Sequence, residues 1–196
     1  MTLPTTPSQT IGPFFGFALN WADGPYVVPA GFPGGVWIRG RVLDGAGAPV
    51  PDALVETWQA DPNGAFASAE EPQAGARAFR GFGRSSTDPQ GLFGVFTVKP
   101  GRVPATPGGA PATVSSPGAR LQAPHIAVTV LARGLLNRVV TRIYFADEPA
   151  ANAEDDVLTS LPDPSRRASL LAAALGDGYR FDIHLQGDHE TVFFAF

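Results

Sequence analysis

The sequence predicts an all-β protein, namely an antiparallel β-sandwich with long Pro/Gly-rich loops, an extended N-terminal arm and one short helix near residues 164–175. The first observation behind this prediction is the spacing of turn-forming residues. The 196 residues include 23 glycines and 20 prolines, which separate many short apolar or alternating runs. The second is that helices are missing between those runs, whereas a parallel α/β sheet requires them. Many short strands joined by turns are typical of sandwiches.

Strand character recurs along the chain as alternation of apolar and polar side chains or as short apolar runs. The predicted strands are residues 36–43, 54–59, 80–85, 92–98, 125–131, 138–145, 179–185 and 191–196. Alternation is clearest in 138–145, where one face consists of Val139, Thr141, Ile143 and Phe145. It is equally clear in 179–185, where Arg180, Asp182 and His184 alternate with apolar residues. A sheet with one buried face is expected.

One segment has helical signals. Asp163 suits the N-cap position and Pro164 the first helical position. Gly176 would end the run, and an apolar stripe on the helix would be formed by Leu170, Leu171 and Leu175. These signals predict the helix near 164–175.

Composition excludes several functional classes. The net charge is −4 and no basic block occurs, which argues against a nucleic-acid partner. No cysteine is present, so disulfides, a zinc ribbon and a thiol nucleophile are excluded, and a cytoplasmic location is expected. Neither a signal peptide at the start nor a long apolar stretch points to a membrane. With only 16% charged residues, part of the surface is expected to be covered by another chain.

Two segments differ from ordinary connections. Residues 1–35 contain Phe14, Phe15 and Phe17 without strand or helix periodicity, and disordered tails are poor in aromatics. We therefore expect residues 1–35 to be an arm that packs on a partner subunit, and residues 36–196 to be the sandwich domain. Residues 99–124 form a Pro/Gly-rich stretch longer than most structureless loops, which suggests a functional reason for its length.

Common catalytic motifs are absent from the sequence: it contains no G-x-S-x-G, H-E-x-x-H or P-loop pattern. The histidines are His125, His184 and His189. The last two lie in HLQGDHE with Asp188 and Glu190, where a metal site is conceivable, but a solvated turn before the last strand is the better interpretation. His125 begins a predicted strand and shares a face with Ala127, because side chains two apart point the same way. A non-haem iron site needs several ligands on one face, and this strand offers one.

Several long motifs, in order along nearly the whole chain, carry a family resemblance. They are TPSQTIGPFF, ALVETWQADPNGAF, GLFGVFTVKPGRVP, APHIAVTVLARGLLNRVVTRIYF and YRFDIHLQGDHETVFFAF. Together they resemble the intradiol ring-cleaving dioxygenases. The resemblance implies O2-dependent cleavage of a catechol acid between its two hydroxyl groups.

The resemblance also implies an iron site that this sequence cannot complete. Working family members hold Fe(III) with two tyrosines and two histidines, and the matching positions are Phe66, Val103, His125 and Ala127. Three of the four ligands are therefore replaced. An arginine that the family places three residues before the first histidine is Gln122 here.

Within the family, these replacements resemble the alpha subunit of an enzyme built from alpha–beta pairs, in which the beta subunit holds Fe(III). The resemblance implies that this chain contributes substrate-binding residues to a pocket for a small aromatic acid and O2: Thr10, Gly12, Pro13 and Arg133. Thr10 offers a hydroxyl, Gly12 close backbone approach and Arg133 a fixed cation. Alternatively, Arg133 is a solvated turn residue and residues 10–13 only anchor the arm.

Two other hypotheses remain open from the sequence. One is a metal-free β-sandwich binding or carrier module that forms its own homo-oligomer. The other is an iron site shared by His125 and a second copy of the chain, against which Phe66 and Val103 argue because they put apolar side chains at ligand positions.

Overall fold

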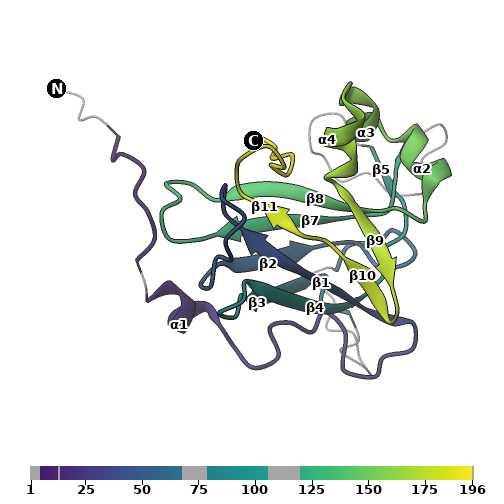
Figure 1. The fold of residues 1–196 in the computed structure, drawn as a ribbon. Helices are drawn as coiled ribbons and strands as arrows, with labels where there is room; N and C mark the ends of the chain where they lie inside the picture. Colours follow the sequence, from purple (N-terminus) through teal and green to yellow (C-terminus); the bar gives the residue numbers. More distant parts are fainter. Residues whose placement is uncertain (1–4, 13, 68–78, 106–119, 196) are drawn as a thin grey trace.

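The chain folds around one mixed, nearly closed β-sheet (Figure 1). The computed structural model describes residues 5–12, 14–67, 79–105 and 120–195. The strands of the main sheet are β1 (Gly35–Leu43), β2 (Leu54–Trp58), β3 (Phe82–Ser86), β4 (Leu92–Val98), β7 (His125–Leu131), β8 (Val139–Phe145), β9 (Leu171–Leu175), β10 (Gly178–Arg180) and β11 (Ile183–His184). Their order is β11-β1-β10-β9-β8-β7-β2-β3, and β4 pairs with β1. The prediction of a β-rich fold is confirmed.

The antiparallel sandwich is the part of the fold prediction that is wrong. β9 pairs parallel with β8, and both β10 and β11 pair parallel with β1. A parallel pair needs a crossover connection, and between β8 and β9 it is made by α2 (Pro149–Glu154), α3 (Asp156–Ser160) and α4 (Pro164–Ala168). β3 and β4 approach each other where the Gly94 amide donates to Ser85 Oγ at 3.2 Å, so the sheet curls toward a barrel.

The predicted helix near 164–175 is half right. Asp163 caps α4 by accepting from the Ser165 amide at 2.8 Å, and Pro164 is its first residue. The helix ends at Ala168, however, and residues 171–175 form β9, which pairs with both β8 and β10. Tertiary pairing therefore overrides the helical propensity of this leucine- and alanine-rich run.

Other differences from the predicted elements concern the C-terminal part of the chain and the long loop. The predicted strand 179–185 is interrupted between β10 and β11, where the Asp182 side chain accepts from the Arg41 amide. Residues 191–195 form no strand. In the long stretch 99–124, β5 (Val103–Pro104) pairs with β6 (Leu121–Gln122), and residues 106–119 lie outside the described ranges.

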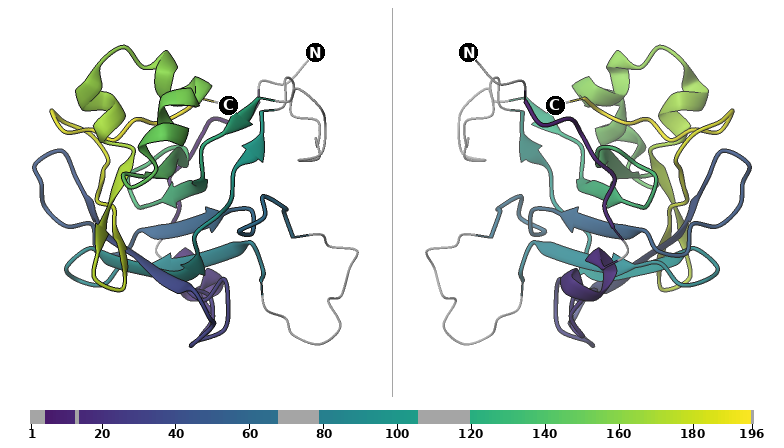
Figure 2. Two further views of the ribbon diagram at one scale, coloured as in Figure 1. Left: turned by 90° about the vertical axis from the view of Figure 1, so that its right-hand side faces the viewer. Right: turned by 90° about the vertical axis from the view of Figure 1, so that its left-hand side faces the viewer.

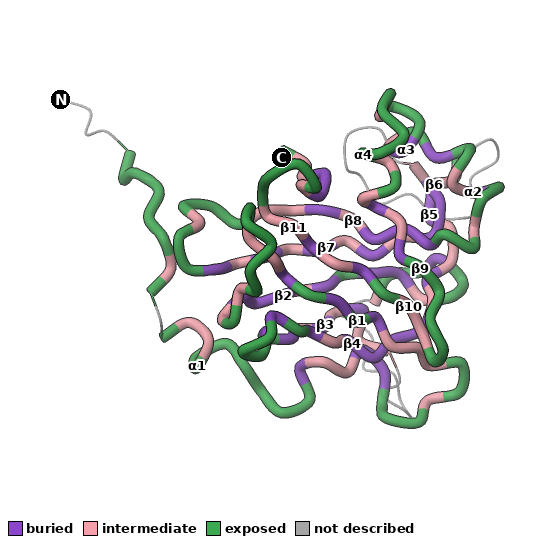
Figure 3. Tube along the Cα trace, viewed as in Figure 1, coloured by how far each residue is buried: buried purple, intermediate pink, exposed green. Residues whose placement is uncertain are grey.

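The core fills the inside of the curved sheet (Figure 3). Its fully buried members come from most strands, and among the largest are Ile38, Leu54, Ile126, Ile143 and Phe145. Of the face predicted for 138–145, Thr141, Ile143 and Phe145 are buried, but Tyr144 on the opposite face is fully buried as well. A second apolar cluster lies beneath α2 and α3 and includes Leu158 and Leu170.

Figure 2 shows α2, α3 and α4 together at one end of the molecule and the short α1 (Phe15–Leu19) at the opposite end. The arm before α1 is exposed, as are the side chains of Phe14 and Phe17. Val27 and Val28, in contrast, are buried against this chain's own sheet. Within the described ranges, no helix has the length and apolar character needed to cross a membrane.

Candidate functional site

The start of β7 places His125 and Ala127 on the outer face of the sheet, between β2 and β8. His125 lies opposite Tyr144 of β8, and Ala127 lies between Trp58 of β2 and Arg142 of β8. Directly paired residues point to the same side of a sheet. Trp58, Ala127 and Arg142 therefore form one row of side chains across three strands.

The other two positions implied by the family resemblance are apolar in structure as well as in sequence. The Phe66 ring stacks on Trp58 with 6.1 Å between centroids and 8° between planes, and half of its side chain area is exposed. Val103 is buried on β5, where it pairs with Gln122. Neither side chain carries an atom that can bind a metal.

His125 is a neutral imidazole whose hydrogen-bonding direction is set by the backbone. Its Nδ1 lies 2.8 Å from the Ala123 carbonyl oxygen, so Nδ1 carries the proton and Nε2 is left as an acceptor. Burial and the nearby positive charge of Arg142 lower the pKa of His125 to about 4. The imidazole is therefore uncharged at neutral pH.

The Arg142 guanidinium lies beside this imidazole and is held by two neutral oxygens. Its Nη1 donates to Gln122 Oε1 at 2.9 Å and to the Tyr144 hydroxyl at 3.2 Å. Burial is the main reason why the pKa of the Tyr144 hydroxyl is raised, so it stays protonated. At Gln122, where the resemblance implies an arginine, the Arg142 guanidinium reaches the side chain from β8.

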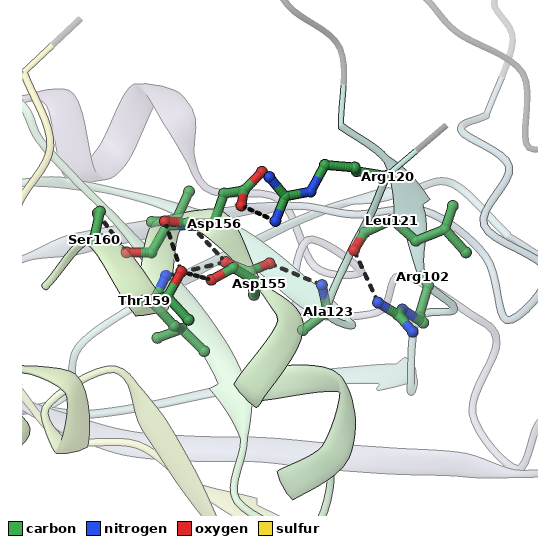
Figure 4. Close-up of polar contacts among 10 residues, drawn as sticks. Arg102, Arg120, Leu121, Ala123, Asp155, Asp156, Thr159 and Ser160 are labelled. Carbon is green, nitrogen blue, oxygen red and sulfur yellow. Dashed lines mark hydrogen bonds and ion pairs between the residues drawn. The ribbon is translucent and has the colours of Figure 1, made fainter. Parts of the chain in front are cut away.

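The buried carboxylate of Asp155 extends this hydrogen-bond network. Asp155 is fully buried at the N-terminus of α3, where it accepts from the Val157 and Leu158 amides. It also accepts from the Ala123 amide at 2.8 Å and from the Tyr144 hydroxyl at 3.2 Å. Figure 4 shows Asp155 facing Ala123 from the helix end. The segment that leads into β7 is thereby fixed to α3.

Two arginines also hold this segment (Figure 4). Arg102 donates to the Leu121 carbonyl oxygen at 2.9 Å and forms an ion pair with Glu154. Arg120 forms an ion pair with Asp156 of α3, where both partners are largely exposed. The segment before β7 is therefore linked to three consecutive acidic residues, Glu154, Asp155 and Asp156, before His125 begins the strand.

These residues do not fit an iron ion. Among the four matching positions only His125 has a donor atom, and Fe(III) sites use several oxygen or nitrogen ligands. Within the described ranges, no group of three or more His, Cys, Asp or Glu side chains is placed to hold a metal ion. No chemical step through iron can be assigned to this chain's own residues.

The predicted substrate-binding residues lie elsewhere, at the turn after β7. Thr10 Oγ1 accepts from the Gly134 amide at 2.9 Å, which fastens the arm to this turn. The Arg133 side chain forms an ion pair with Asp52 and remains more than half exposed. The structure therefore brings Thr10 and Arg133 to the same turn.

Gly12 lies two residues further along the arm. A Cβ added there would meet no atom within 4 Å, so nothing in the described part of this chain requires glycine at that position. Pro13 lies outside the described residues. The positions His125 and Ala127 lie at the start of the seven-residue strand β7, and the turn that holds Thr10 and Arg133 lies after its end.

The turn HLQGDHE is separate from both groups. The His184 and His189 rings lie 6.0 Å apart between centroids, and they line a pocket of about 490 Å³ with Arg166 and Arg180. Gly187 in this turn has a φ of 96°, a conformation that favours glycine.

Comparison with known proteins agrees with the motifs. The profile of a family described as "Dioxygenase" matches residues 11–187. The protocatechuate 3,4-dioxygenase alpha chain of Burkholderia cepacia is 40% identical over 98% of this chain and 98% of its own length. The chain belongs to the intradiol dioxygenase family.

Two further members show how far this family likeness extends. The protocatechuate 3,4-dioxygenase beta chain of Burkholderia cepacia is 33% identical and is matched over 79% of this chain and 65% of its own length. The dioxygenase domain of a carbohydrate-binding fusion protein from Streptomyces sp. SirexAA-E is 27% identical, with a TM-score of 0.57. That match covers 94% of this chain and 99% of that domain. The likeness to intradiol dioxygenases is therefore one of sequence and of fold.

Sequence reasoning missed Arg142, Tyr144 and Asp155 as parts of this site. A signal for the first two was present, because alternation in 138–145 placed both on the outer face. Nothing in the sequence indicated that the face of β8 would lie beside His125. Asp155 carries an N-cap signal before Asp156–Ser160, but its contact with Ala123 comes from tertiary packing.

Proposed function

We propose that this chain is the non-iron-binding alpha subunit of a protocatechuate 3,4-dioxygenase. With a beta subunit it would cleave protocatechuate between its hydroxyl groups, using O2, to give 3-carboxy-cis,cis-muconate. One observation carries the proposal: a chain that matches an alpha chain over nearly its full length has a single imidazole where the family's iron ligands would lie. The proposed location is the cytoplasm, in keeping with a sequence without cysteine.

In this proposal Fe(III) belongs to the beta subunit, and this chain alone is inactive. Support comes from the apolar side chains of Phe66, Val103 and Ala127, which cannot replace an oxygen or nitrogen ligand. The similarity to a beta chain supports a common origin of the two subunits, after which only one kept the metal.

The contribution of this chain would be to bind and orient the substrate carboxylate. Arg133 supplies a permanent cation, and its ion pair with Asp52 limits the rotamers of a long side chain. Thr10, fastened to the Gly134 amide, would present the arm, with Gly12 and Pro13, to the same pocket. Accurate placement of a substrate has a large effect on rate even without chemistry from the placing residue.

The arm is proposed to pack on the beta subunit. Phe14 and Phe17 expose 78% and 85% of their area on this chain, which is costly for aromatic side chains in water. Large exposed apolar groups of this kind mark protein–protein contacts. Burying both would give the pair of chains a contact close to the Thr10–Gly134 turn.

The test is to purify this chain alone and together with a beta-type polypeptide, and then to measure iron content and O2 uptake with protocatechuate. We expect iron and turnover only when both chains are present. Iron bound stoichiometrically by this chain alone, with turnover, would refute the proposal.

In the complex, Arg133→Gln is expected to raise KM for protocatechuate by about 10-fold or more, because a charge-assisted hydrogen bond contributes about 1.5–3 kcal/mol. Arg138→Gln is the matched control: Arg138 is exposed, five residues along the same loop, and should leave KM unchanged. Equal KM values for the two variants would show that Arg133 does not bind the substrate.

A further inference from the structure

A pocket of about 480 Å³ lies among the three short helices that connect β8 with β9, at one end of the molecule (Figure 2). Volumes of this size are usual for sites that bind small molecules. Its apolar lining is entirely aliphatic and consists of Pro149, Ala153, Leu158, Pro164, Ala168 and Leu171. Leu158 is buried in the second apolar cluster and Leu171 packs against it, so this side of the pocket is part of the core.

One charged side chain, that of Arg167 in the last turn of α4, also lines this pocket. It is partly buried, and no described residue forms an ion pair or a side-chain hydrogen bond with its guanidinium. The other partly buried arginines of the described ranges each have such a partner, and they are Arg80, Arg84, Arg102 and Arg142. Arg167 therefore offers the pocket a permanent positive charge with unused hydrogen-bond donors.

The described carboxylates of these helices and of their N-caps all have other partners. They are held by Lys99, by Arg102 and Arg120, by backbone amides or by the Ser165 hydroxyl, and they are Glu148, Glu154, Asp155, Asp156 and Asp163. The uncharged polar residues of the lining are engaged as well. Asn152 Nδ2 donates to the Phe145 carbonyl oxygen at 2.8 Å, and Thr159 Oγ1 donates to the Asp155 carbonyl oxygen at 2.8 Å. The described part of the helical segment thus supplies no direct counter-charge for Arg167.

We propose that this pocket binds a small aliphatic carboxylate, with the acid group on Arg167 and the hydrocarbon chain against the leucine, alanine and proline side chains. The planar guanidinium fork matches a carboxylate and can hold it through two parallel hydrogen bonds. An aliphatic lining favours an apolar chain, because every methylene group that leaves water contributes to binding. A catechol acid would lose the hydration of its hydroxyl groups against the same side chains.

This site is independent of the proposed dioxygenase function. Its lining shares no residue with the positions of the missing iron ligands or with the turn that holds Thr10 and Arg133. The experiments on it therefore need neither a beta subunit nor turnover, and their outcome is separate from that of the iron and O2 measurements.

The test is a calorimetric titration of the purified full-length chain with octanoate. We expect saturable binding of one molecule per chain. Arg167→Gln should weaken binding at least 10-fold, because charge-assisted hydrogen bonds are lost. Arg166→Gln is the matched control and should leave the affinity unchanged. Arg166 precedes Arg167 in α4, but it is exposed and lines the pocket of His184 and His189 instead.

Two ligand series on the unmodified chain keep the proposal falsifiable if Arg167→Gln does not fold. Octanamide has the same chain without the charge, and it should bind at least 10-fold more weakly than octanoate. The affinity should also rise about threefold to fourfold for each methylene group added between butanoate and octanoate, as expected for burial of the chain in an apolar pocket.

A further variant fills the pocket from α2. Ala153→Leu enlarges an exposed alanine that lines the pocket, and leucine is compatible with a helix. It should weaken octanoate binding at least 10-fold, while thermal unfolding shows that the variant is folded. The proposal is overturned by absence of saturation, by equal affinities of the Arg166 and Arg167 variants, by equal binding of octanamide, by affinity that does not depend on chain length, or by unchanged binding in Ala153→Leu.

Discussion

Replacing Asp155 by alanine should destabilise this protein more than any loss of a helix cap alone would. The change removes the acceptor of four donors, namely the amides of Ala123, Val157 and Leu158 and the Tyr144 hydroxyl. Loss of the N-cap costs about 1 kcal/mol, and each buried donor left without a partner costs about 1–3 kcal/mol. Because water can enter and relieve part of this penalty, we expect a total of about 3–5 kcal/mol.

Chemical and thermal unfolding, followed by circular dichroism, measure this loss. For a chain of this size, 3–5 kcal/mol corresponds to a fall in Tm of roughly 10 °C. Asp163→Ala is the matched control, since Asp163 also caps a short helix through one amide at 2.8 Å but is exposed, and its loss should lower Tm much less. Similar losses in the two variants would show that the buried contacts of Asp155 with Ala123 and Tyr144 contribute nothing, which would refute the reasoning.

Two more predictions concern His125 and the packing of β1. The folded pKa of His125 is about 4, below its unfolded value, so the unfolded chain takes up a proton first and stability falls as pH drops below about 6.5. Urea unfolding should show about 2 kcal/mol more loss between about pH 7.5 and pH 5 for the native chain than for His125→Gln, and equal losses would contradict the lowered pKa. Gly40→Ala should be strongly destabilising, because its Cβ would lie 1.7 Å from the Phe181 carbonyl oxygen, whereas Gly12→Ala meets no atom within 4 Å and should be neutral. A Gly40→Ala protein with native Tm would show that β1 can move away from the backbone at Phe181 at no cost.

The strands that could be predicted from the sequence are those with strong local patterns. Residues 92–98 and 125–131 have the predicted bounds, and 36–43 and 138–145 are right to within one residue. The failures share a physical cause. Residues 171–175 carry a good helical pattern, but their backbone pairs on both sides with other strands, and no local pattern encodes that pairing.

In the candidate site, too, some features could be predicted from the sequence and others could not. The identity of the residues at 66, 103, 125 and 127 already indicates that iron ligands are missing, because phenylalanine, valine and alanine have no donor atoms whatever the fold. The contact of Thr10 with Gly134 could not be derived from spacing, since 124 residues separate the two. Nor could the position of Arg142 beside Gln122, which depends on the pairing of β7 with β8.

By itself the sequence determined the chemistry available to this protein: a β-rich chain of the intradiol dioxygenase type, without cysteine and with one histidine where a metal site would need several groups. The tertiary structure alone decided what surrounds that histidine. Register across three strands sets Trp58 and Arg142 on either side of Ala127, and a buried carboxylate from a distant helix fixes the segment before it. The physical reason is that donor atoms belong to residues, whereas their convergence depends on strand pairing between segments far apart in the chain.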